Sequence, residues 1–180
     1  VIAPDQVIGK IIKLHTESNG FPSLEQVKIA IIGITENRNA FYPTLDYDLD
    51  SFRNSFYNLF PGKWTINIAD LGNLPNGESV NDTYFAISEI CNQLHRKNII
   101  TVLIGGSHDM IYPIYKSYSI NKKLTNIVSI DSQFDFSQEE ELISGRSYMS
   151  RIIMEEPNFL HNFTNLGFQS FFISQEELDL

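Results

Sequence analysis

The sequence predicts an α/β fold built on a mainly parallel sheet, because short apolar runs alternate along the chain with segments of helical period. Five runs rich in Ile, Val and Phe have the composition of strands that are covered on both faces: 29–34, 65–69, 99–104, 126–130 and 168–173. We expect these strands to form one sheet with helices on both faces, in which 99–104 lies beside 126–130.

The segments between the expected strands carry helical patterns. Apolar residues recur three, four and seven positions apart within 52–60 and within 87–94, and each set forms one apolar stripe on a helix. Further helices are expected before the turn at 19–22, just after the glycines at 105–106 with Ser107 near the cap, and over 146–155.

Composition bounds the class of protein. The chain has 180 residues, of which 42% are hydrophobic, enough for a globular core. A net charge of −9 argues against nucleic acid and anionic membrane as partners, since both need a Lys/Arg-rich face. A single cysteine and no long apolar segment predict a cytoplasmic protein. The acidic run at 138–141 is interpreted as a solvated loop.

Two of the expected strand ends carry residues suited to metal binding. After the third strand the chain reads G-G-S-H-D, where paired glycines allow a tight turn that places His108 at the start of a helix. After the fourth it reads D-S-Q-F-D, with Asp131 and Gln133 on one side of an extended chain and Asp135 in the loop beyond. Function gathers at the carboxyl ends of parallel strands, so His108, Asp131 and Asp135 are predicted to converge on one cation. Imidazole with carboxylates suits Mn or Zn.

The same residues also have a purely structural interpretation. A histidine after G-G-S commonly caps or packs a helix, and the D-x-x-x-D spacing is common in proteins. Considered without further context, the residues leave both interpretations open.

Taken in order, the motifs resemble those of the ureohydrolase superfamily, which includes arginase, agmatinase and formimidoylglutamase. G-G-S-H-D, followed about twenty residues later by I-D-S-Q-F-D, is similar to the family signatures G-G-D-H-S and D-A-H-x-D. D-L-G-N-L at 70–74, N-D-T-Y at 81–84 and S-G at 144–145 follow in the family order. G-F-Q-S-F-F-I at 167–173 resembles a strand of the formimidoylglutamase-like branch, and the similarity begins at about residue 26.

The resemblance implies a three-layer α/β/α fold with a doubly wound sheet, in which 1–180 is a single arginase-like domain and the N-terminal portion of a larger fold. It also implies two manganese ions that activate water for attack on the guanidino or formimino carbon of a small amino-acid-derived substrate. The family's metal ligands carry over by position to His108, Asp131, Gln133 and Asp135. Its substrate-binding loop carries over to Ser144, Arg146 and Ser147. The alternative for Arg146 is a solvated residue that opens the next helix.

The chain departs from the family pattern at several points. Gln133 stands where the family has a histidine, and its amide oxygen is a poorer ligand for a transition metal than an imidazole nitrogen. Ser107 replaces the aspartate before His108, and Asp109 replaces the serine after it. The later family signature S-x-D-x-D-x-x-D-P has no match, and 174–180 resembles the start of a helix, so we expect the chain to stop partway through the fold.

Three functional hypotheses follow. The first is part of a metal-dependent hydrolase that cleaves a guanidino or formimino C–N bond. The second is a pseudoenzyme that keeps the fold, has lost the metal pair and acts as a binding or assembly component. The third is an unrelated doubly wound α/β domain, which the lack of a glycine-rich nucleotide-binding motif disfavours. An incomplete parallel sheet is also expected to be covered at its edge, either by the remainder of the fold or by a second copy or a protein partner.

Overall fold

The computed structural model describes residues 6–40, 48–65, 67–137 and 143–179. The chain forms two compact units, and each is considered by itself. Unit 1 comprises 1–36, 44–77 and 93–106, and unit 2 comprises 37–43, 78–92 and 107–180. One of the boundaries between the units falls within α3 (Val80–Arg96). The acidic run at 138–141 lies outside the described residues.

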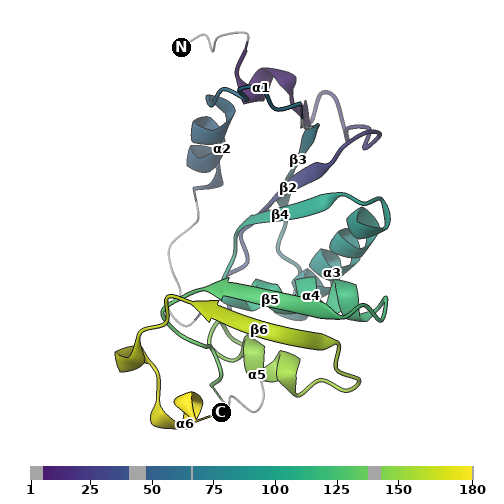
Figure 1. The fold of residues 1–180 in the computed structure, drawn as a ribbon. Helices are drawn as coiled ribbons and strands as arrows, with labels where there is room; N and C mark the ends of the chain where they lie inside the picture. Colours follow the sequence, from purple (N-terminus) through teal and green to yellow (C-terminus); the bar gives the residue numbers. More distant parts are fainter. Residues whose placement is uncertain (1–5, 41–47, 66, 138–142, 180) are drawn as a thin grey trace. The chain divides into compact units, whose positions relative to one another are not determined.

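Unit 1 contains a parallel sheet of four strands in the order β1-β3-β2-β4. Figure 1 labels β2, β3 and β4 of this sheet. The strands are β1 (Lys13–Leu14), β2 (Ile29–Ile34), β3 (Ile68–Leu74) and β4 (Ile100–Gly105). The apolar run of β2 suits its place between β3 and β4, and its residues 30–34 are buried. The helices of this unit are α1 (Ile8–Ile11) and α2 (Leu49–Tyr57).

A buried carboxylate ties α2 to the sheet of unit 1. Asp70 on β3 is 2% exposed and accepts two hydrogen bonds from the Arg53 guanidinium, at 2.8 and 3.1 Å. The Tyr57 hydroxyl donates to it at 2.7 Å, and the Gly72 amide donates at 2.9 Å. Burial alone would raise the pKa of the Asp70 carboxyl, but these hydrogen bonds hold that pKa below its usual value.

Unit 2 is a parallel pair of strands packed against helices. Strand β5 (Thr125–Ile130) runs beside β6 (Leu160–Leu166), as Figure 1 shows. The helices α4 (Ile111–Ser119) and α5 (Tyr148–Ile153) share one core with β5, made of Tyr115, Ile127, Tyr148, Met149 and Ile152. A final turn, α6 (Gln175–Leu178), begins with a capping box between Ser174 and Glu177.

Only one face of β5 is buried among the described residues. Ile127 and Ser129 point into the core, whereas Val128 is 62% and Ile130 is 85% exposed. Strand side chains alternate between the two faces, so α4 and α5 cover one face of this pair and leave an apolar face open. The second helical layer over this pair therefore stays a prediction.

The predicted α/β class with parallel strands is confirmed, and two of the expected strands need correction. The described strands form two hydrogen-bonded sheets, and the expected adjacency of β4 and β5, which belong to different units, stays a prediction. The strand expected at 168–173 is wrong, because Gly167 has a φ of 91° and a 3₁₀ turn follows at Ser170–Phe172. The actual strand is the polar β6, and the strand expected at 65–69 begins only at Ile68.

The predicted helices are present, with different lengths. The stripe of α3 is confirmed, with Ile87, Cys91 and Leu94 buried. Helix α2 ends at Tyr57, so the expected contribution of residues 59 and 60 to its stripe is wrong, and both side chains are more than half exposed. The N-terminal helix is a single turn, and α5 is shorter than predicted. Within the described part of the chain, no helix combines the length and apolarity needed to span a bilayer.

The Asp70 network gives the first prediction. Asp70→Asn leaves the Arg53 guanidinium, which is 14% exposed, without its charge partner, and we expect the free energy of unfolding at pH 7 to fall by about 3 kcal/mol. Because folding lowers the pKa of Asp70, the carboxylate stabilises the fold above the pKa of the unfolded chain. The difference between wild type and variant should therefore shrink as the pH falls through the folded pKa. Urea unfolding followed by circular dichroism measures both effects.

Asp50→Asn is the matched control for this measurement. Asp50 lies 4.0 Å from the same guanidinium, but its side chain is 87% exposed. Exposed ion pairs contribute little, so this variant should unfold within about 0.5 kcal/mol of wild type. Equal losses in the two variants would contradict a special role for the buried pair.

Candidate metal centre

Two glycines precede the turn that carries His108. Gly105, the last residue of β4, and Gly106 have φ values of 86° and 76°, a left-handed conformation that residues with a Cβ rarely adopt. The chain then forms a 3₁₀ turn at His108–Met110 that leads into α4. Ser107 precedes this turn as expected, but its side chain makes no capping hydrogen bond. Asp109 and Met110 are buried, which anchors the turn, whereas the His108 side chain is 38% exposed.

A local turn positions Asp131 at the end of β5. Its amide donates to the Leu166 carbonyl on β6 at 3.1 Å, which continues the strand pairing. Its Oδ1 accepts hydrogen bonds from the Gln133 amide at 3.0 Å and from the Ser132 hydroxyl at 3.3 Å. An Asp side chain that bonds the backbone two residues later forms a turn, so the extended chain predicted for Asp131 and Gln133 is wrong.

Asp135 is reached through a second unusual backbone conformation. Its φ of 59° lies in the left-handed region, where Asp is better tolerated than most residues. The Gln133 carbonyl accepts a hydrogen bond of 2.6 Å from the Asn165 side chain, which ties the turn to β6. The Asp135 side chain is 4% exposed, so its carboxylate is held in the interior of unit 2.

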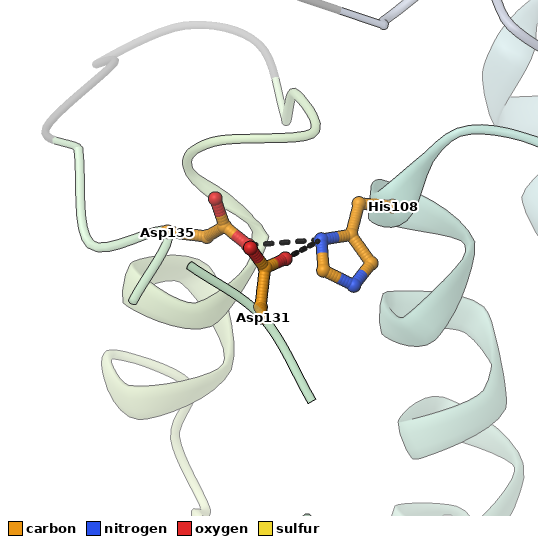
Figure 2. Close-up of side chains that lie close together, drawn as sticks. All are labelled: His108, Asp131 and Asp135. Carbon is orange, nitrogen blue, oxygen red and sulfur yellow. Dashed lines mark ion pairs between the residues drawn. The ribbon is translucent and has the colours of Figure 1, made fainter. Parts of the chain in front are cut away.

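The three residues meet at one ring nitrogen. Nδ1 of His108 lies 3.0 Å from Oδ2 of Asp131 and 2.9 Å from Oδ2 of Asp135, and Figure 2 shows both carboxylates beside this nitrogen. One ligand atom from each residue lies within 4.8 Å of the others. A nitrogen and two carboxylate oxygens form a donor set that fits Mn²⁺ or Zn²⁺. The predicted convergence of His108, Asp131 and Asp135 is thus present in the structure.

The electrostatics of the cluster are dominated by its negative charge. The hydrogen bond with Asp135 raises the pKa of His108, against the opposing effect of burial. The charges of Asp135, Asp131 and Asp109 raise that pKa further. The same field that favours a proton on the imidazole favours a cation between the carboxylates.

Asp109 has a separate role in the same turn. Its side chain is completely buried, and its Oδ2 accepts a hydrogen bond from the Tyr84 hydroxyl on α3. It is absent from the group of three that could hold a cation among the described residues. Asp109 therefore anchors the turn that carries His108, and it adds negative charge to the surroundings of the cluster.

The loop predicted to bind substrate is held by its own serines. The Ser147 hydroxyl accepts from the Ser144 amide at 2.9 Å and lies 3.2 Å from the Ser144 hydroxyl, and Ser144 in turn accepts from the Arg146 amide at 3.2 Å. Asn39 fastens the loop, since its side chain donates to the Ile143 carbonyl at 2.6 Å. The roles of Ser144, Arg146 and Ser147 in substrate binding stay predictions.

The family model for the arginase family matches residues 27–179. The chain belongs to the arginase family. No curated protein matches it. Formimidoylglutamase from Bacillus subtilis is 14% identical, with a TM-score of 0.78 over 99% of this chain and 58% of its own. Formiminoglutamase from Trypanosoma cruzi, a structure with Mn²⁺, is 12% identical, with a TM-score of 0.76 over 87% of this chain and 58% of its own.

A third solved structure shows the same fold similarity. Agmatine ureohydrolase from Thermoplasma volcanium is 18% identical, with a TM-score of 0.68 over the whole of this chain and 59% of its own. The chain therefore spans less than two thirds of the length of these solved relatives. At such low identities the similarity establishes the fold alone.

Sequence reasoning missed three supporting residues. Tyr148 packs its ring on that of His108, with centroids 5.1 Å apart, but the sequence analysis placed it only within a helix. Tyr84 and Asn39 were not singled out, although N-D-T-Y was part of the family resemblance. An aromatic residue directly after S-G-R-S was the available signal for Tyr148, because that segment follows a candidate ligand loop.

The cluster gives a prediction about His108 itself. Asp135→Asn removes the hydrogen-bonded carboxylate that contributes most to the raised pKa, so the pKa of His108 should fall. Asp131→Asn removes a smaller effect, which comes from the charge of Asp131 alone, and should lower that pKa less. An NMR pH titration of the imidazole protons in metal-free protein measures both shifts. A larger effect from Asp131→Asn would contradict the dominance of Asp135.

Proposed function

We propose that this chain is part of a metal-dependent hydrolase of the ureohydrolase type, which cleaves a guanidino or formimino C–N bond in an amino-acid-derived substrate. The observation that carries the proposal is the placement of His108 Nδ1 within 3.0 Å of both the Asp131 and the Asp135 carboxylates. Membership in the arginase family supports it, and so does the manganese in the structure of a relative with this fold.

Mn²⁺ is the cation that we propose for the cluster. Bound by these residues, it would lower the pKa of a water molecule and polarise the bond to be cleaved. Asp131 and Asp135 supply the negative charge, and His108 supplies the nitrogen that favours a transition metal over Mg²⁺ or Ca²⁺. On the loop at 144–147, Arg146 is proposed to bind the substrate carboxylate, for which a guanidinium has matching geometry.

A second candidate function is that of a pseudoenzyme that serves as a binding or assembly component. Gln133 favours the pseudoenzyme. Its backbone forms hydrogen bonds within the turn, and its side-chain amide is a weak ligand for a transition metal. The apolar face of β5 at Val128 and Ile130 supports a further proposal, that a second copy or a protein partner covers this surface. A cytoplasmic location fits either function.

The enzyme proposal is tested on a protein that carries this chain together with the paired-aspartate signature of the family. We expect Mn²⁺-dependent release of urea or formamide from arginine, agmatine or formiminoglutamate, and loss of that activity in Asp135→Asn. Asp179→Asn, which changes an exposed residue of the same unit, is the control and should retain activity. Activity that survives Asp135→Asn would refute the assigned site.

Gln133 distinguishes the two candidate functions. If the amide weakens metal binding, Gln133→His should tighten Mn²⁺ binding by about tenfold or more, on the scale of changes around a ligand set. Isothermal titration calorimetry with MnCl₂ measures the change. An unaltered affinity would show that the side chain at 133 does not face the cation, in which case its loss is no evidence for a pseudoenzyme.

The 180-residue chain alone should bind at most one Mn²⁺ and should not hydrolyse arginine, agmatine or formiminoglutamate. Its described residues offer one histidine and two carboxylates at the cluster, too few anionic ligands to hold two divalent cations close together. A crystal structure grown with MnCl₂ is the measurement. Two ions about 3.5 to 4 Å apart, the spacing of two-metal hydrolytic sites, would overturn this expectation.

A further inference from the structure

Tyr148 lies against the metal cluster but is not one of its ligands. It is the first residue of α5 and is completely buried in the core of unit 2. Its ring is tilted by 56° against the His108 ring, with the centroids 5.1 Å apart. The core contacts hold the phenol in one place, because the side chain packs with Tyr115, Met149 and Ile152.

The hydroxyl of Tyr148 is a buried donor that lacks an aligned acceptor. It lies close to Asp135 and Ser129, yet it forms no hydrogen bond of normal geometry with any described residue. Burial raises the pKa of this phenol, and the charge of Asp135 raises it further, so the hydroxyl keeps its proton. A buried hydroxyl without a partner is unfavourable, and each such group in a native protein calls for an explanation, a nearby ion among them.

Metal binding would change the groups that surround the Asp135 carboxylate. In the structure, Nδ1 of His108 occupies the position between the two carboxylates and lies 2.9 Å from Oδ2 of Asp135. An imidazole nitrogen that binds a cation can no longer donate a hydrogen bond. The carboxylate then loses its ion-pair partner at His108, and the Tyr148 hydroxyl is a buried donor beside it. Ligating carboxylates are themselves hydrogen-bonded in metal sites, and these bonds fix their orientation.

We propose that Tyr148 is a positioning residue of the metal site. When His108, Asp131 and Asp135 hold a divalent cation, the Tyr148 hydroxyl donates a hydrogen bond to Asp135 and keeps that carboxylate in its ligating orientation. The inference rests on the metal site of the proposed function, and it adds a residue that neither the sequence pattern nor the ligand group identified.

The test is Tyr148→Phe in the 180-residue chain, titrated with MnCl₂ by calorimetry. Removing the donor should weaken Mn²⁺ binding by about tenfold, as loss of an outer hydrogen-bond partner typically does. The melting temperature of the metal-free variant should not fall, because the deleted hydroxyl has no aligned hydrogen bond in the described structure.

Tyr115→Phe is the matched control. Tyr115 belongs to the same core and is 1% exposed, but its hydroxyl already accepts a hydrogen bond of 3.0 Å from the Phe159 amide. This variant leaves a backbone donor unpaired, so its melting temperature should fall while its affinity for Mn²⁺ stays at the wild-type value. A general loosening of the core would instead change the two variants in parallel.

The outcomes separate the two hypotheses. Weaker Mn²⁺ binding in Tyr148→Phe alone, without loss of stability, supports the positioning role. Wild-type affinity in Tyr148→Phe overturns that role and leaves the metal site intact. Equal losses of affinity in both tyrosine variants also overturn it. Failure of the wild-type chain to bind Mn²⁺, with His108→Ala giving the same trace, overturns the metal site and the Tyr148 inference together.

Discussion

The site depends on one imidazole nitrogen that lies between two carboxylates. Asp131 and Asp135 would repel each other if nothing positive stood between them, and the low exposure of Asp135 makes solvent screening weak. His108 meets this need in the described structure, and the raised pKa of its ring follows from the same field. A proton on the imidazole and a divalent cation thus compete for one position, which links the charge of His108 directly to metal binding.

Asp70 and Asp135 show how a buried carboxylate with a structural role differs from one that can bind a metal ion. Asp70 accepts four hydrogen bonds from Arg53, Tyr57 and Gly72, so its lone pairs are occupied and it has little capacity for a ligand. Asp135 is nearly as buried, yet its charge partner is an imidazole that can exchange its proton for a metal ion. Two carboxylates of similar burial therefore differ in their capacity to bind a metal ion. The number of hydrogen-bond donors that the fold fixes around each carboxylate makes the difference.

The sequence predicted those parts of the structure that depend on short-range patterns. The apolar run predicted β2, and the apolar stripe predicted α3. The paired glycines at 105–106 predicted a tight turn. Strand β6 was missed because its sequence is polar and lacks the hydrophobic periodicity of a strand. Its backbone pairing with β5, which depends on residues distant in sequence, makes it a strand. The convergence of His108, Asp131 and Asp135 was predictable from strand ends, whereas the contact with Tyr148 depends on how α5 packs.

The charge of the cluster sets how many cations it can hold. Asp131 and Asp135 together carry two negative charges, which one divalent ion neutralises, and a second ion would add two positive charges with no described carboxylate to balance them. Asp109 cannot fill this gap, because its carboxylate is bound by Tyr84 in the interior. Replacing Gln133 with histidine would add a ligand but no negative charge. Gln133 can therefore tune how tightly one ion binds, whereas a second ion requires additional carboxylates beyond this cluster.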